Sequence, residues 1–251
     1  MSPRVAILID GGYFLKRVPQ LGYSLPQSSP EDYADEASRI LDWMVNGHLE
    51  KLNDTYTVEK PWSLLHRVFF YDAYPYRGEG TLPISKDMVD FGQTQVALYR
   101  RKLLNKIKSK RKFMLRLGEV VQEREWLLKA EVQDKLLSGE LPPDQLADDD
   151  FLSGMRQKGV DMRIGLDIAV LTLKKQADII ILVSGDSDFV PAAKLARREG
   201  MEFILDPLWQ SIKYELYEHV DGLTSGLWNR TQPAPASVRR TGDYSRDDRL
   251  T

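Results

Sequence analysis

Two aspartates follow a buried strand in the second half of the chain. Asp186 and Asp188 come directly after the apolar run Ile179–Val183 and a Ser-Gly pair. A short, continuous apolar run that stops at a turn indicates a buried parallel strand, and open α/β sheets bind ligands just beyond the carboxyl ends of such strands. Carboxylates at that place could hold a divalent cation. The alternative is that Asp188 only caps the helix that begins near Phe189.

The first strand-like segment of the chain also ends in an acid. Arg4–Asp10 has an apolar interior and is followed by two glycines, which permit a tight turn. If this strand runs parallel to the later one, Asp10 lies where Asp186 lies; a plain turn aspartate is the alternative. A third such segment, His66–Ala73, contains Asp72 near its end. Whether Asp72 joins the other acids or only terminates its strand stays open.

A helix that is apolar on most sides carries two further acids. The segment Arg156–Gln176 has the spacing of a largely buried helix, with Asp161 near its start and Asp167 inside it. An aspartate among apolar neighbours costs free energy unless it is paired or bound to a metal. Asp167 is therefore the least ordinary acid of the chain. The alternative is an ion pair with Arg163, four residues earlier.

These acids together suggest a metal-dependent hydrolase. A helical crossover returns the chain to the same edge of a sheet, so carboxylates that are distant in sequence can converge there. Several close carboxylates cannot all stay ionised without a cation. Oxygen ligands without histidine or cysteine favour Mg²⁺ or Mn²⁺, which suit the hydrolysis of phosphodiesters.

One segment of the chain is strongly basic. Residues 91–118 contain nine basic side chains and no acidic ones, and their apolar residues recur at helical spacing. This pattern predicts a helix with a buried stripe and a basic face that binds a phosphate backbone, although a merely solvated face is the alternative. Lys158, close to Asp161, is a further candidate for phosphate. The basic contacts expected in the segment are Arg100, Arg101, Lys108, Arg111 and Lys112.

Composition excludes several classes of site. The chain has 251 residues, no cysteine and three scattered histidines, which rules out disulfides, zinc–thiolate sites and thiol catalysis and leaves a Ser–His triad poorly supported. The net charge of −2 gives no global attraction for nucleic acid. We find no signal peptide and no apolar run long enough for a membrane, and we expect a cytoplasmic protein.

The elements that must position these residues form one α/β domain. We expect it to span residues 1–228, with a mainly parallel central sheet and a variable helical insertion at about 122–155. The triple aspartate at the end of that insertion is interpreted as solvated linker. The polar residues 229–251 are expected to be a disordered tail.

Three motifs of the chain resemble those of one family. The stretches I-L-I-D-G-G-Y-F, K-G-V-D-x-x-x-x-x-D and L-V-S-G-D-S-D-F occur in the order found in NYN domains, which are PIN-like nucleases. The chain is most similar to the bacterial LabA branch of that family. The resemblance spans Val5 to about Leu223 and leaves out the insertion and the tail.

This resemblance implies a fold, an activity and a set of site residues. The fold would be a PIN-like three-layer α/β/α sandwich, and the activity Mg²⁺- or Mn²⁺-dependent cleavage of RNA. Asp10, Asp167 and Asp186 match the family's core metal-binding acids, whereas Asp188 and Asp161 match accessory acids, Asp188 as a further metal ligand. Many relatives have asparagine where this chain has Tyr13, an aromatic that could stack on a base.

Two other functions stay open at this point. The chain could be an RNA-binding regulatory module that keeps the fold without efficient turnover, and DNA could replace RNA as the substrate. A phosphatase of the HAD type is a weaker alternative, because its Asp-x-Asp motif follows the first strand, where this chain has Asp-Gly-Gly. A homodimer is also left open.

Overall fold

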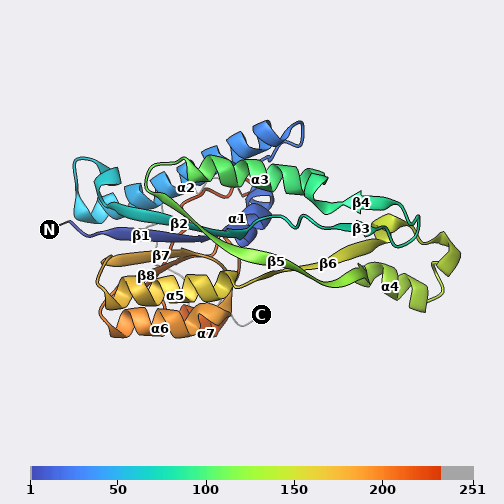
Figure 1. The fold of residues 1–251 in the computed structure, drawn as a ribbon. Helices are drawn as coiled ribbons and strands as arrows, with labels where there is room; N and C mark the ends of the chain where they lie inside the picture. Colours follow the sequence, from blue (N-terminus) through green and yellow to red (C-terminus); the bar gives the residue numbers. More distant parts are fainter. Residues whose placement is uncertain (1, 233–251) are drawn as a thin grey trace.

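The computed structural model describes residues 2–232, which build a seven-stranded sheet in the order β6-β5-β2-β1-β7-β8-β9. Strand β1 (Val5–Asp10) lies in the middle, between β2 (Leu65–Ala73) and β7 (Ile179–Val183), and it pairs with both in parallel (Figure 1). All five residues of β7 are buried, as are the first five of β1. Their continuous apolar sequences fit strands that are covered on both faces.

The outer strands complete a mainly parallel sheet. On one side β8 (Glu202–Asp206) pairs with β7, and the short β9 (Gly222–Leu223) pairs with β8, both in parallel. On the other side β5 (Phe113–Leu128) runs parallel to β2 and antiparallel to β6 (Phe151–Lys158). The expected α/β class with a mainly parallel sheet is confirmed.

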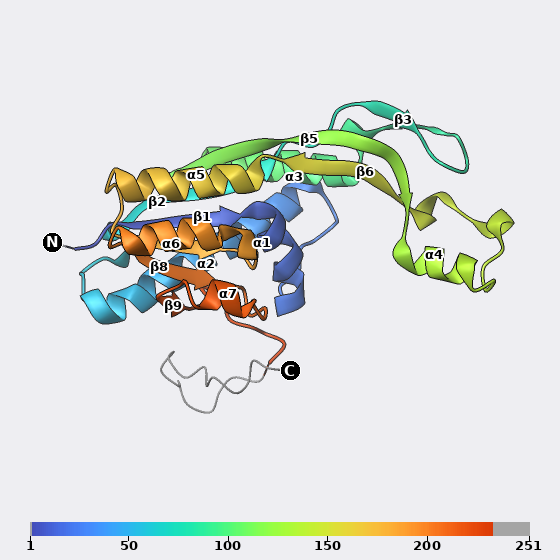
Figure 2. The ribbon, with the colours of Figure 1, turned by 90° about the horizontal axis from the view of Figure 1, so that it is seen from below.

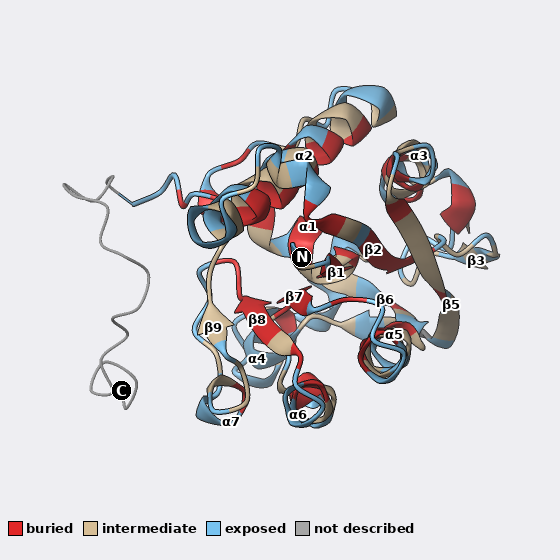
Figure 3. Cartoon of the chain, turned by 90° about the vertical axis from the view of Figure 1, so that its left-hand side faces the viewer, coloured by how far each residue is buried: buried red, intermediate tan, exposed pale blue. Residues whose placement is uncertain are grey.

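Helices cover both faces of this sheet and form a three-layer sandwich (Figures 2 and 3). Two buried apolar clusters, one on each face, hold the layers together. The sandwich is the PIN-like arrangement that the motifs implied. One face carries α1 (Gly11–Arg17), α2 (Pro30–Tyr56) and α3 (Gln95–Lys108), and the other carries α5 (Val160–Leu173), α6 (Val190–Arg198) and α7 (Tyr214–Tyr217).

The winding of the chain reverses between β1 and β7. The crossovers through α2 and α3 lie on one face, and those through α5 and α6 lie on the other (Figure 3). Open α/β sheets bind their ligands in the crevice beyond the strand ends at such a reversal. Asp10 is the last residue of β1, and Asp186 follows β7 by three positions, so both acids lie at this edge.

A long β-hairpin projects from the carboxyl edge of the sheet. Strand β5 leaves β2 after Gly118 and continues as a hairpin with β6, whose pairs run from Glu119–Lys158 to Leu128–Phe151 (Figures 1 and 2). We call residues 119–158 the arm. The expectation that the insertion at about 122–155 is helical is therefore wrong for most of its length. Only α4 (Ala130–Leu137) and two short 3₁₀ turns are helical there.

Contacts with a second, smaller hairpin support the arm. Trp126 on the arm donates a hydrogen bond of 2.7 Å to the carbonyl of Thr81 in β3 (Glu79–Thr81), which pairs with β4 (Met88–Asp90). The first residue of the triple aspartate, Asp148, accepts a backbone hydrogen bond of 2.8 Å from Ile84. That aspartate therefore fastens the loop of the smaller hairpin to the arm.

The segment after β9 packs back onto the sandwich. Asn229 is buried, and the next residue, Arg230, donates its backbone N–H to Leu21 and places its guanidinium 3.9 Å from the ring centroid of Tyr23. We expected a disordered tail to begin at residue 229, but residues 229–232 are ordered. Residues 233–251 lie outside the described part. None of the helices in residues 2–232 combines the length and apolarity that crossing a bilayer requires.

Candidate functional site

Asp10 joins the central strand to the first helix. Its Oδ1 accepts a hydrogen bond of 3.0 Å from the backbone N–H of Tyr13, so this carboxylate caps α1. Loss of hydration raises the pKa of Asp10 to about 6, and the negative charges of Asp161 and Asp72 add to the rise. Asp10 is thus both a turn residue and a member of an acidic cluster.

The glycine after Asp10 lets the turn lie close to the sheet. A Cβ at Gly11 would be 2.6 Å from the carbonyl oxygen of Tyr71 and closer still to the ring of Phe70. Any other residue would push α1 away from β2 and turn Asp10 with it. The Asp-Gly pair therefore fixes the direction of this carboxylate.

Asp186 and Asp188 lie on a single 3₁₀ turn, Ser187–Phe189, between β7 and α6. The Oδ1 of Asp186 accepts a hydrogen bond of 3.0 Å from the backbone N–H of Asp188. The capping role that the sequence left open for Asp188 therefore belongs to Asp186. Both side chains are exposed, and that of Asp188 is left available to a ligand.

Asp161 interacts electrostatically with the acids of both strand ends. Its charge acts on Asp10, and the charges of Asp186 and Asp188 act on Asp161. It occupies the first turn of α5, the helix that starts where β6 returns to the carboxyl edge. Partial burial raises the pKa of Asp161, and the charges of Asp186 and Asp188 raise it further. The structure thus links four acids from three parts of the chain, and we call them the edge acids: Asp10, Asp161, Asp186 and Asp188.

The donor set of the edge acids suits a hard divalent cation. Their oxygen atoms are the ligands that Mg²⁺ and Mn²⁺ prefer, and no basic side chain in the described residues forms an ion pair with any of them. Burial is the main cause of the raised pKa of Asp10, and the charges of Asp161 and Asp72 add to it. In the described arrangement, however, no three acidic or histidine side chains are close enough to enclose a metal ion. Binding one would require their side chains to turn inward.

Asp167, which the sequence suggested as a metal ligand, has two partners within the protein. Its Oδ2 is 2.9 Å from the hydroxyl of Tyr71 on β2 and 2.9 Å from Nε of Arg116 on β5. The charge of this largely buried carboxylate is therefore balanced by the protein. The alternative partner is corrected as well, since Arg163 donates instead to the carbonyl of Gly159.

Asp72 is an anchor on the other face of the sheet. Its side chain is fully buried, and its Oδ1 accepts a hydrogen bond of 2.8 Å from Nε2 of Gln157 on β6. Its Oδ2 forms an ion pair with Arg100 of α3. Asp72 therefore ties α3 and the arm to β2, and it acts on the edge acids only through its charge.

The expected basic surface of α3 is mostly occupied by the protein itself. Arg100 pairs with Asp72, Arg101 donates to the carbonyl of Gly92, and Lys112 donates to the carbonyl of Leu65. Three further lysines of the segment pair with acids of α2, namely Lys102 with Glu31, Lys106 with Asp35, and Lys110 with Asp42. Most of these cations therefore already have partners within the protein, and their expected contact with a phosphate backbone stays a prediction.

The two remaining cations of that segment lie far from the acids. Lys108 and Arg111 are exposed, but they sit where α3 ends and β5 begins. Since β5 runs parallel to β1, its first residues lie at the amino edge of the sheet, opposite the edge acids. They cannot hold the same phosphate that a metal at the edge acids would bind.

Lys158 and Tyr13 lie near the edge acids but are both engaged. The Nζ of Lys158 is 2.7 Å from Oε1 of Glu123 on the arm, although the lysine stays more than half exposed. The hydroxyl of Tyr13 donates to the carbonyl of Pro207, its ring lies against Gly185, and burial raises its pKa. The ring of Tyr13 is thus fixed against Gly185, and the suggestion that it stacks on a base stays a prediction.

Sequence reasoning missed Arg116, the partner of Asp167. A signal was present, because the alternation of Phe113, Leu115 and Leu117 assigns those three to one face of a strand. Arg116 must then point to the opposite face, which α5 covers. Because Asp167 lies inside the helix that covers this face, the strand pattern would have predicted an ion pair between Arg116 and Asp167.

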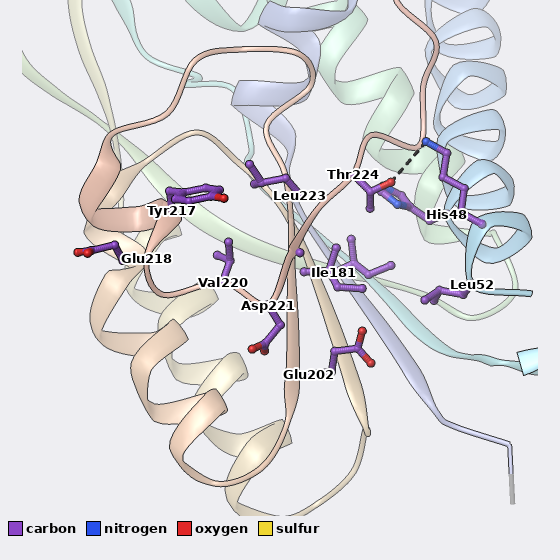
Figure 4. Close-up of a pocket in the computed structure, with 13 residues that line it drawn as sticks. His48, Leu52, Ile181, Glu202, Tyr217, Glu218, Val220, Asp221, Leu223 and Thr224 are labelled. Carbon is purple, nitrogen blue, oxygen red and sulfur yellow. Dashed lines mark hydrogen bonds between the residues drawn. The ribbon is translucent and has the colours of Figure 1, made fainter. Parts of the chain in front are cut away.

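The pocket drawn in Figure 4 lies away from the edge acids. It has a volume of about 500 Å³ and is lined by Ile181 and Glu202 from the sheet and by His48 from α2. Its lining reaches from Glu202, the first residue of β8, to Thr224, directly after β9, and includes none of the edge acids. Beside it, Nε2 of His48 is 2.8 Å from the buried carboxylate of Asp206. That pair packs the α2 face and does not contribute to the acidic site.

Comparisons with known proteins give a family. The family model described as NYN domain matches residues 88–225, more than half of the chain. No curated protein matches. Among solved structures, a protein of unknown function from Vibrio parahaemolyticus is 15% identical over 88% of this chain and 91% of that chain, with a TM-score of 0.44. A Sir2–p53 peptide–NAD⁺ structure is 15% identical over 91% and 89%, with a TM-score of 0.31.

The family match covers most of the site. It includes Asp161, Asp186 and Asp188, whereas Asp10 precedes it on the central strand. The two solved structures have TM-scores below 0.5 and add nothing to the family assignment. The chain belongs to the NYN domain family, a group of PIN-like nuclease domains.

Proposed function

We propose that this protein is a metal-dependent ribonuclease whose site is the set of edge acids. The observation that carries the proposal is their convergence: carboxylates from β1, α5 and the turn after β7 lie within electrostatic reach of one another without a basic partner. Burial raises the pKa of Asp10 to about 6, and the charge of Asp161 adds to that rise. Mg²⁺ or Mn²⁺ would be held by Asp10, Asp161, Asp186 and Asp188. The family supports phosphodiester hydrolysis, and RNA is the substrate class that we propose.

Each residue of the site has a separate task. A bound divalent ion would activate water and stabilise the charge of the leaving oxygen. Asp10 must give up its proton before it can be a ligand, and the hydrogen bond from the backbone of Tyr13 favours its charged form. The backbone of Asp188 holds Asp186 in place in the same way. These hydrogen bonds fix one oxygen of Asp10 and one of Asp186, and the side chains of the set would still have to turn toward each other to enclose a cation.

Asp167 contributes as a positioning residue in this proposal. Its bonds to Tyr71 and Arg116 fasten α5 to β2 and β5 in the middle of the helix. Because Asp161 lies in the first turn of the same helix, this attachment determines where Asp161 stands relative to Asp10. Loss of Asp167 would then impair the site without removing a ligand.

The test is the cleavage of labelled single-stranded RNA with Mg²⁺ or Mn²⁺. We expect Asp186→Asn and Asp161→Asn each to lower the rate by about a hundredfold or more, the scale of losing one charge-stabilising group. Asp149→Asn on the arm is the matched control and should leave the rate unchanged. A single-stranded DNA of the same sequence in parallel reactions identifies the preferred sugar.

A second candidate is a non-enzymatic RNA-binding module. The observation that favours it is the absence, among residues 2–232, of three acids close enough to enclose a metal. Binding of RNA by the wild type without any metal-dependent cleavage would establish this alternative and end the nuclease proposal.

A further inference from the structure

A groove runs from the edge acids along the outside of the sandwich, between α5 and α6. Its volume is about 490 Å³, and one end is formed by Asp161 and Asp188. The rest of its lining is apolar and contains no basic residue. The apolar side chains that form most of its walls are Met162, Leu166, Phe189, Pro191 and Leu195.

The α5 wall of this groove is unusually exposed for its composition. Met162 is 71% exposed and Leu166 is 58% exposed, whereas Ile164 and Ile168 on the inner side of the same helix are fully buried. The sequence had suggested a helix buried on most sides. An exposed apolar strip beside a polar site marks a place where a ligand or partner is bound.

A glycine keeps the groove open. Gly165 lies in its lining, and a Cβ added there would meet nothing within 4 Å. The helix does not need glycine at this position, since alanine is favoured by about 1 kcal/mol in a helix interior. A larger residue would extend into the groove and leave the core untouched.

We propose that this groove binds a nucleobase next to the phosphate held at the edge acids, an inference that rests on the proposed nuclease function. The lining offers apolar side chains and two carboxylates but no cation, so it disfavours phosphate and suits the uncharged, flat face of a base, which gains from burial against apolar side chains. The carboxylates at the end of the groove can accept hydrogen bonds from an exocyclic amino group. The groove is thus a subsite for substrate positioning.

The competing occupant is a second copy of the chain. The apolar strip of α5 continues past the groove to Val170, 41% exposed, and Leu173, 62% exposed. A helix–helix contact would use this whole strip, whereas a base would use only the part near Asp161. Leu173 therefore separates the two occupants, because it lies on the strip but does not line the groove.

The decisive variant is Gly165→Leu, which fills the groove, with Leu173→Ala as the matched control. The substrates are a single-stranded RNA and an abasic ribose–phosphate chain of equal length, cleaved with Mn²⁺. We expect the wild type to prefer the RNA by about tenfold in kcat/KM, the factor that corresponds to about 1.4 kcal/mol from burying part of a base against apolar side chains. Gly165→Leu should lose this preference while its cleavage of the abasic chain is unchanged, and Leu173→Ala should keep it.

The outcomes separate this inference from the proposed function. If the wild type cleaves neither substrate, the nuclease proposal fails and the subsite fails with it. If it cleaves both equally, or if Gly165→Leu keeps the preference, the nuclease stands and the subsite is overturned. Sedimentation that shows a dimer dissociated by both Gly165→Leu and Leu173→Ala would assign the groove to a second copy.

Discussion

The carboxylate of Asp10 is held at a cost to the folded protein. Its pKa is raised from 3.8 to about 6, so between those values the folded protein binds more protons than the unfolded chain. The contribution of Asp10 to the free energy of unfolding then falls as the pH rises from about 4 to about 6. This loss of stability is complete at pH 7, where Asp10 is ionised, as it must be to bind a metal ion.

Asp10→Asn should therefore stabilise the protein at neutral pH. Asparagine keeps an oxygen for the backbone N–H of Tyr13 and removes the buried charge, so we expect a gain of about 1–3 kcal/mol at pH 7. The gain should vanish near pH 4. Urea unfolding of both proteins at the two pH values measures it. Equal stability at pH 7 would show that Asp10 is not electrostatically strained.

A divalent cation should reverse the same penalty in the wild type. A ligand at a hundred times its Kd raises the free energy of unfolding by about 2.7 kcal/mol if it binds the folded protein alone. Thermal unfolding with increasing Mn²⁺ should show this rise for the wild type and little of it for Asp10→Asn or Asp161→Asn. A rise of the same size in all three proteins would locate the ion elsewhere.

Tyr71 gives a separate measure of the attachment of α5. Its buried hydroxyl donates to the charged Asp167, a type of hydrogen bond that contributes about 1.5–3 kcal/mol. Tyr71→Phe should lower stability toward the smaller figure, because Arg116 still holds the carboxylate. Tyr74→Phe, at an exposed tyrosine, is the control and should change nothing.

At the scale of elements, the inner strands could be predicted because burial on both faces leaves a direct trace in sequence. β1, β2 and β7 are largely apolar runs whose ends lie within one residue of the predicted ones. The positions of Asp10 and Asp186 at the carboxyl edge follow from those ends alone. This part of the site needs no knowledge of distant contacts.

The pairings of charged residues could not be predicted in this way. Lys106 and its partner Asp35 are 71 positions apart, and Arg116 and Asp167 are 51 apart. A run of basic residues has the same pattern in sequence whether its face meets water, RNA or an acidic helix. The second half of β5 was not predicted either. It pairs only with β6, which follows it in sequence after more than twenty intervening residues.

The pairing between α2 and α3 leads to a prediction about RNA binding. Lys108→Glu and Arg111→Glu reverse the two exposed charges of the basic segment, yet they lie at the amino edge. We expect the double variant to bind single-stranded RNA within about twofold of the wild type, with the same dependence of log K on log salt. A salt slope reduced by about two would instead show that both residues contact phosphate.

At the scale of the whole molecule, charge is distributed unevenly. The arm holds ten acidic and five basic residues, a net charge of −5 in a protein whose total is −2. It projects from the same edge that carries the acidic site (Figure 2). An RNA that approaches this edge must therefore avoid the arm or overcome its repulsion, which acts over about 10 Å at 0.1 M salt.

Shortening the arm should strengthen RNA binding. Gln122 and Met155 are opposite each other in the hairpin, so an Asn-Gly turn can join them in place of residues 123–154. The change removes nine acidic and three basic residues and releases Lys158 from Glu123. Affinity measured by fluorescence anisotropy should rise most at low salt. Weaker binding by a folded variant would mean that the arm itself contacts RNA.

The central position of β1 has a consequence for dividing this protein. The family match starts at residue 88, yet the two strands that separate β5 from β7 both precede it. A polypeptide limited to the matched residues would leave a gap of two strands in the middle of its sheet, with unpaired backbone along both sides. Recombinant fragments cut at that boundary should aggregate when expressed alone. Co-expression with residues 1–87 offers them the missing strands.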